Sequence, residues 1–88
     1  MTWEVRVDRD AEWQLLKLDR PVQRRIIAYL RDRIAGTDNP RRLRKALRGP
    51  QKQLWRYRVG DYRLVCDIED DAKTVLVLLI AHRREAYR

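Results

Sequence analysis

The sequence predicts an α+β protein in which two N-terminal helices pack on one face of a small, mainly antiparallel, four-stranded sheet. The first half of the chain carries one strand pattern followed by two helical patterns, and the second half carries three strand patterns joined by short turns. Consecutive strands with short connections pair as an antiparallel meander, so the expected order is β-α-α-β-β-β. The 88 residues suffice for one domain, which we expect to span residues 1–88.

The N-terminal half is predicted to contain one strand and two helices. Residues 3–7 alternate apolar with charged side chains, which is the period of a strand with one buried face. Apolar residues at helical spacing predict a first helix over about residues 11–18, and Asp8 or Asp10 can cap its N-terminus. Pro21 in the first turn and Gly36 after the last turn bound the second predicted helix.

The C-terminal half is predicted to form three strands. Residues 54–59 and 62–68 are joined by Gly60 and Asp61, which form a tight turn. The segment TVLVLLIA, residues 74–81, is an unbroken apolar run and is typical of a strand that is covered on both sides. We therefore expect a hairpin followed by the most buried strand of the sheet.

The first of these strands carries two arginines that point the same way. Arg56 and Arg58 alternate with Trp55 and Tyr57, so two guanidinium groups lie on one face and two aromatic rings on the other. Both predicted helices cover a single face of the sheet. The arginines are thus expected to face something other than the protein core.

The net charge of +8 is concentrated in the middle of the chain. Between residues 39 and 63 there are nine basic side chains, seven of them arginine, and one acidic side chain, while the flanking segments are nearly neutral. Such a concentrated positive field is typical of a polyanion site, and arginine forms a better fork for phosphate than lysine does. A solvated basic face that keeps a small protein soluble is the alternative.

Several classes of function are disfavoured. The sequence has no apolar run long enough to span a bilayer and no secretory pattern at its start, so we expect a cytoplasmic protein without a membrane partner. It contains no serine, no glycine-rich phosphate loop and no paired histidines at metal spacing. The single cysteine, Cys66, lies within an apolar strand pattern and is expected to be a buried structural thiol. We expect neither a metal nor another cofactor.

The remaining candidates for chemistry are basic, aromatic or histidine side chains near the hairpin and the C-terminus. Cleavage of RNA needs a group near the ribose 2′-hydroxyl, cations around the scissile phosphate and a proton for the leaving oxygen, and arginine, tyrosine and histidine supply these if they converge. His82 can equally be a surface residue, and Tyr87 can simply pack a chain end. The candidates are Arg56, Arg58, Arg63, His82, Arg83, Arg84, Glu85 and Tyr87.

Three segments together resemble a known family. They are LRG at 47–49, LWRYRVGDYRLV at 54–65 and LLIAHRREAYR at 78–88. With the two predicted helices between the first strand and the basic segment, the chain resembles a RelE-type toxin of the RelE/ParE superfamily of type II toxin–antitoxin modules. The resemblance implies the same α+β fold. It also implies a ribosome-dependent, metal-independent endoribonuclease that cleaves mRNA through attack of the 2′-hydroxyl on the adjacent phosphate, and so inhibits translation.

The resemblance also implies roles for individual residues. The motif arginines fall on Arg63 and Arg83, and the motif tyrosine falls on Tyr87. His82 stands next to Arg83, and some related toxins use a C-terminal histidine as acid or base. These four are the predicted catalytic residues. The motif's basic pair falls on Arg56 and Arg58, but arginine stays charged at working pH and so is expected to hold phosphate rather than abstract a proton. From its charge, the basic segment adds the other predicted RNA-binding residues, which are Arg41, Arg44, Lys45, Arg48 and Lys52.

The implied partners are an acidic antitoxin, the ribosome and mRNA, with DNA reached only indirectly through the antitoxin. Two other functions stay open. A ParE-like member would poison DNA gyrase through protein contacts, and an inactive member would bind RNA without cutting it.

Overall fold

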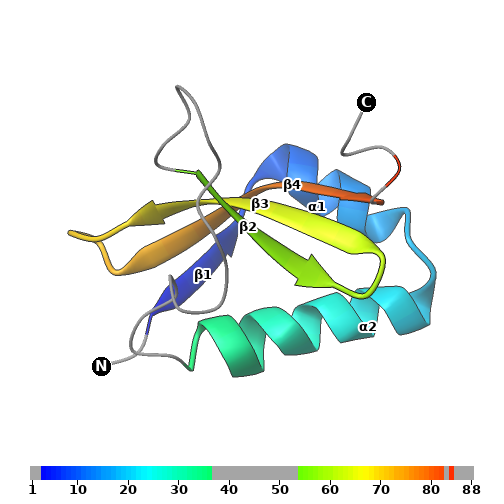
Figure 1. Ribbon diagram of the computed structural model, residues 1–88, viewed down its shortest axis with the longest axis horizontal. Helices are drawn as coiled ribbons and strands as arrows, with labels where there is room; N and C mark the ends of the chain where they lie inside the picture. Colours follow the sequence, from blue (N-terminus) through cyan, green and yellow to red (C-terminus); the bar gives the residue numbers. More distant parts are fainter. Residues whose placement is uncertain (1–2, 37–53, 83, 85–88) are drawn as a thin grey trace.

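The computed structural model describes residues 3–36, 54–82 and 84. Within them the predicted order of elements is confirmed, and the sheet runs β1-β4-β3-β2 (Figure 1). β1 pairs with β4 in parallel, and the other neighbouring strands are antiparallel. The sheet is therefore mixed, with the C-terminal meander supplying its antiparallel majority. The elements are β1 (Glu4–Val7), α1 (Arg9–Leu16), α2 (Arg20–Ala28), the π-helical turn η1 (Tyr29–Ile34), β2 (Leu54–Val59), β3 (Tyr62–Glu69) and β4 (Thr74–His82).

The first helix begins two residues earlier than its apolar pattern indicates. Asp8 is the N-cap, and its carboxylate accepts a hydrogen bond of 3.4 Å from the backbone N–H of Asp10. A cap at this position satisfies a helix donor that would otherwise have no partner, so the helix starts at Arg9. Ala11 and Leu15, one turn apart, are buried, and α1 packs behind β4 (Figure 1).

The second helix ends in a wider turn than predicted. Pro21 stands in the first turn of α2, as expected, but the last turn is π-helical, with the N–H of Ala35 donating to the carbonyl of Leu30 at 2.9 Å. Ile26, Leu30 and Ile34 are buried at intervals of four residues. The helical segment thus presents one continuous apolar stripe to the sheet.

The core lies between the helices and one face of the sheet. Tyr57, Leu64, Cys66, Val75 and Val77 are fully buried on that face. Because side chains alternate along a strand, their neighbours in sequence lie on the opposite face, which no described helix covers. The expected buried position of the Cys66 thiol is confirmed.

The central strand β4 extends past the end of its parallel partner. The last backbone bond to that side joins the N–H of Asp8 to the carbonyl of Val77 at 2.8 Å. Beyond it, Gln14 of α1 takes the place of a strand, since its side-chain oxygen accepts from the N–H of Ile80 at 2.7 Å. A register shift between Val65 and Cys66 accompanies this change of partner.

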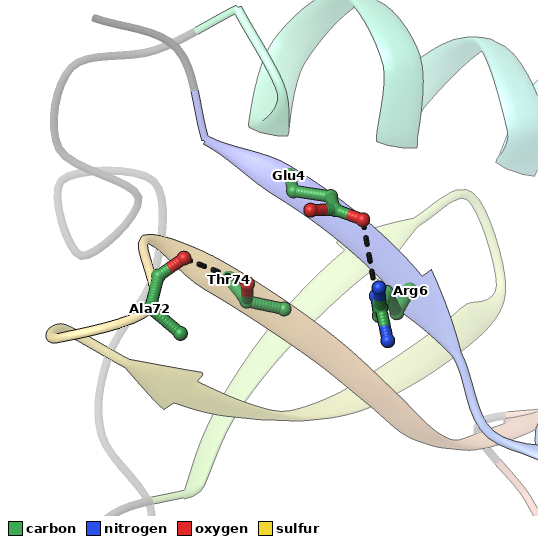
Figure 2. A network of polar contacts seen from close by, with 4 residues as sticks. All are labelled: Glu4, Arg6, Ala72 and Thr74. Carbon is green, nitrogen blue, oxygen red and sulfur yellow. Dashed lines mark hydrogen bonds and ion pairs between the residues drawn. The ribbon is translucent and has the colours of Figure 1, made fainter.

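The other end of β1 is held by the turn between β3 and β4. The N–H of Glu4 donates to the carbonyl of Lys73 at 2.8 Å. Figure 2 shows the hydroxyl of Thr74 donating to the carbonyl of Ala72 at 2.9 Å in the same turn, and the ion pair between Glu4 and Arg6 at 3.0 Å. Because that ion pair is exposed, the backbone bonds contribute more to this corner than the charges do.

The tight turn between β2 and β3 depends on Gly60. Its φ is +59°, and a Cβ there would lie 3.2 Å from Nη1 of Arg25. We predict that Gly60→Ala lowers the free energy of unfolding by about 1–2 kcal/mol, because L-residues are strained at this φ. Asp61→Ala, at the exposed second turn position, is the matched control and should change it little. Equal losses for the two variants in urea denaturation would contradict this account.

Burial raises the pKa of the Cys66 thiol from 9.0 to about 12. We predict that iodoacetamide at pH 8.5 labels the native protein at least ~10²-fold more slowly than the urea-unfolded chain, because only the thiolate reacts. The thiol of the unfolded chain ionises at a lower pH than the buried thiol of the native protein. The preference of the native protein for the neutral thiol therefore costs no stability below pH 9.0, and ionisation of the unfolded chain lowers the free energy of unfolding as the pH rises from there to about 12. Similar labelling rates in the two states would show that the thiol is accessible.

Candidate nucleic-acid interface

The register of the β2–β3 hairpin sorts its charged and apolar side chains onto opposite faces. Tyr57 pairs with Leu64, and both are fully buried against the helices. Arg58 pairs with Arg63 in the next rung, and Arg56 pairs with Val65. These three arginines therefore share the face of the sheet that points away from the core. We call Arg56, Arg58 and Arg63 the arginine cluster.

The arginine cluster brings like charges together. Arg58 and Arg63 stand directly opposite each other, and Arg56 is the diagonal neighbour of Arg63. Like charges at such positions repel each other across a strand pair.

The three arginines differ in depth. Arg58 is exposed, Arg56 is half-buried, and Arg63 is only 8% exposed, with its Nη1 shielded from solvent. Arg63 lies on the inner strand β3, opposite the small side chain of Ala81 on β4. The cluster thus has a deep guanidinium on the inner strand and a more accessible one on the edge strand. In a partly desolvated position an arginine interacts more strongly with an anion than it does in water.

His82 lies apart from the arginine cluster. It pairs with Tyr62, which packs against the core, so the pleat places His82 on the helix-covered side of the sheet. The two rings meet edge to face, with centroids 5.3 Å apart. Nδ1 of His82 accepts a hydrogen bond of 3.3 Å from the backbone N–H of Arg84, so in the neutral ring the proton is on Nε2. These contacts orient the ring at the end of β4.

The other predicted site residues lie outside the described residues. They are Arg41, Arg44, Lys45, Arg48, Lys52, Arg83 and Tyr87, together with Glu85 among the wider candidates. Of the predicted residues that the structure describes, it brings together the arginine cluster and leaves His82 on the other side. Arg84, which follows β4, is exposed.

A second group of arginines escaped the sequence analysis. Arg25 and Arg33 flank Tyr29 along the helical segment and line a pocket of about 360 Å³ with Arg58 and the hairpin turn. The N-terminal segment is nearly neutral overall, so its charge gave no signal. The spacing of Arg25, Tyr29 and Arg33 at intervals of four residues could have shown that they share one helix face.

The described residues offer no evident metal site and no membrane span. In residues 3–36, 54–82 and 84, no three histidine, cysteine or carboxylate side chains are grouped so that they could hold a metal ion. None of the helices in these ranges is long and apolar enough to cross a bilayer.

The fold is that of RelE-type toxins of known structure. The chain is similar to a chain of the toxin–antitoxin complex RelBE2 from Mycobacterium tuberculosis, with 28% identity, a TM-score of 0.85, and coverage of 94% of this chain and 100% of that one. It is also similar to a chain of the archaeal RelE–RelB complex from Pyrococcus horikoshii, with 27% identity, a TM-score of 0.75, and coverage of 94% and 97%.

The family model for the ParE toxin of the type II toxin–antitoxin system parDE matches residues 5–87, and the chain belongs to this family. The protein is therefore a RelE/ParE-type toxin of a type II toxin–antitoxin module, as its motifs predicted. The free R81A/R83A mutant of Escherichia coli RelE shares the fold at 20% identity, with a TM-score of 0.74 and coverage of 99% of this chain and 90% of that one. No curated protein matches the sequence.

We predict that Arg58→Gln raises the free energy of unfolding by about 0.2–1 kcal/mol at low ionic strength, because it removes a like charge opposite Arg63. The gain should shrink in 1 M salt, which screens exposed charges. Arg6→Gln is the matched control on the other edge strand, since Arg6 pairs with Glu4 and its loss should not stabilise the protein. A destabilised Arg58→Gln protein at low salt would contradict the repulsion.

Proposed function

We propose that this toxin is a ribosome-dependent endoribonuclease that cleaves mRNA without a metal and so inhibits translation. The observation that carries the proposal is the arginine cluster on the face of the sheet that no described helix covers, with Arg63 at its deepest point. Fixed guanidinium forks suit a polyanion whose charge increases during reaction. The similarity to RelE structures at 27–28% identity supports the same choice.

Cleavage of the RNA strand needs a nucleophile that attacks one phosphorus atom and a leaving group that departs from it. The ribose 2′-oxygen forms a bond to the adjacent phosphorus, and the bond from phosphorus to the 5′-oxygen breaks, which leaves a 2′,3′-cyclic phosphate and a 5′-hydroxyl. A base takes the 2′-hydroxyl proton, and an acid protonates the leaving oxygen. The phosphorane between these steps carries additional negative charge, which we assign to Arg63 and Arg83 for stabilisation.

The remaining residues divide between holding RNA and moving protons. Arg56 and Arg58 remain charged throughout the working pH range and hold backbone phosphates. We assign the same role of holding phosphate to the basic residues of the segment 39–52. We assign proton handling or a hydrogen bond at the reacting phosphate to Tyr87 in preference to His82, because the His82 ring lies on the helix-covered side of the sheet.

In this account the toxin acts in the cytoplasm and is held inactive by an acidic antitoxin. The similar chains of known structure come from complexes named for toxin and antitoxin. An acidic partner would neutralise the arginine cluster and cover apolar surface. The proposal makes residues 1–88 a single toxin domain and leaves DNA contact to the antitoxin.

Gyrase poisoning is the second candidate, and the matching family model favours it because that model describes ParE toxins. A poison that acts through protein contacts would need no residues that stabilise a phosphorane. A third outcome is an RNA-binding member that does not cut. Primer extension on translated mRNA and a gyrase supercoiling assay separate the three functions.

We predict that Arg83→Ala lowers the single-turnover rate of mRNA cleavage on programmed ribosomes by at least ~10²-fold, with little change in ribosome affinity. The double variant Arg41→Ala and Arg44→Ala should instead weaken affinity with little change in rate. Arg84→Ala removes the same charge at the adjacent residue and is the control. Normal cleavage by Arg83→Ala would refute the assigned site, and intact mRNA with the wild-type toxin would refute the nuclease.

A further inference from the structure

A second basic site lies beside the arginine cluster, around the tip of the β2–β3 hairpin. Figure 1 shows this tip beside α2, and the pocket of about 360 Å³ lies between them. Arg25 and Arg33 come from the helical segment, and Arg58 comes from the edge strand. We propose that this pocket binds a backbone phosphate of RNA, at a position distinct from the cleaved bond. The inference rests on the proposed function for the identity of the nucleic acid.

The positive charge of the pocket lining exceeds its negative charge. Its one acidic lining residue, Asp32, is paired with Arg31 at 3.1 Å. Among the described residues, no carboxylate lies within ion-pair distance of Arg25, Arg33 or Arg58. Three guanidinium groups and one carboxylate that is already paired therefore line one concavity. Such a site attracts an anion from solution.

The arginines of the pocket are oriented by neutral contacts. Nε of Arg58 donates to the carbonyl of Gly60 at 3.2 Å, so its side chain bends toward the turn. The guanidinium of Arg33 lies 5.8 Å from the ring centre of Tyr29. The guanidinium of Arg25 approaches Gly60, where any side chain would crowd it. These contacts position the charges without neutralising them, and the pocket is built before an anion arrives.

The position of Arg58 favours RNA over an isolated anion or an acidic protein. Arg58 pairs with Arg63 in the arginine cluster, and it also lines the pocket. The two basic sites are therefore continuous around the edge strand. A nucleic-acid backbone carries a phosphate at every residue and can occupy both sites with one strand. Residues in the pocket would then fix the path of the strand, whereas the cluster would hold the segment that reacts.

The test measures binding of the full-length toxin to a fluorescent, single-stranded, 2′-O-methylated RNA, which cannot be cleaved through its 2′-oxygen. The variant is Arg25→Gln with Arg33→Gln. The matched control is Arg20→Gln with Arg24→Gln, which removes two exposed charges from α2 outside the pocket lining. Binding is followed by anisotropy between 50 and 200 mM salt, because each lost phosphate contact reduces the slope of log K against log salt by about 0.7 on single strands.

We expect the pocket variant to lose about 0.7 from this slope, for RNA of any sequence, while the control keeps the wild-type slope. Equal slopes for the variant and the control would overturn the pocket assignment. The pocket assignment would also be overturned if the variant bound RNA normally but bound its acidic antitoxin more weakly, because the ligand of the pocket would then be a protein.

Asp32→Asn tests the same pocket by removing the one carboxylate that the described residues contribute to its lining, while keeping the arginines. It should tighten RNA binding by about 1.5- to 5-fold, the scale of one exposed charge interaction. Unchanged affinity would count against the pocket. The RNA in this test is not cleavable and no ribosome is present, so failure of the test leaves the nuclease assignment intact. Conversely, a toxin that binds RNA in this pocket but does not cut mRNA contradicts only the nuclease assignment.

Discussion

The register of the β2–β3 hairpin is the constraint on which the proposed site depends. Side chains alternate between faces, so a slip of one residue would move Tyr57 to solvent and the arginines into the core. The two-residue turn at Gly60 fixes this register, because its positive φ lets the strands reverse directly between Val59 and Tyr62. Burial of Tyr57 and Leu64 on one face then determines that Arg58 and Arg63 lie on the other.

Both helices lie on one side of the sheet, and no helix among the described residues covers the opposite face. Gln14 and the N–H of Ile80 join α1 to the part of β4 that β1 does not reach, so the central strand keeps a partner without a further strand. The apolar stripe of α2 and η1 fills the rest of that side. The protein thus builds its core on one face of the sheet, and its other face carries like charges across a strand pair.

Sequence patterns predicted the elements and the shared face of Arg56 and Arg58 because both follow from local periodicity. The position of Arg63 opposite Arg58 follows from the register of the hairpin, which periodicity alone does not determine. The alternation around Tyr57 was enough to place Arg56 and Arg58. Asp8 was one of two aspartates expected to cap α1 and is its N-cap, but the apolar pattern alone placed the start of the helix two residues too late. The orientation of His82 and the pocket at Arg25 depend on how far β4 extends and on the approach of the hairpin to α2, and neither contact leaves a periodic signal.

The central claim is that the open face of the sheet is the surface that contacts RNA. Titration of ¹⁵N-labelled toxin with non-cleavable RNA, followed through the arginine Nε–Hε resonances, tests it most directly because each guanidinium reports its own contact. The account predicts that the largest shifts belong to Arg58 and Arg63. Unshifted resonances for this pair, with the largest changes at Arg9 and Arg20 on the helices, would contradict it.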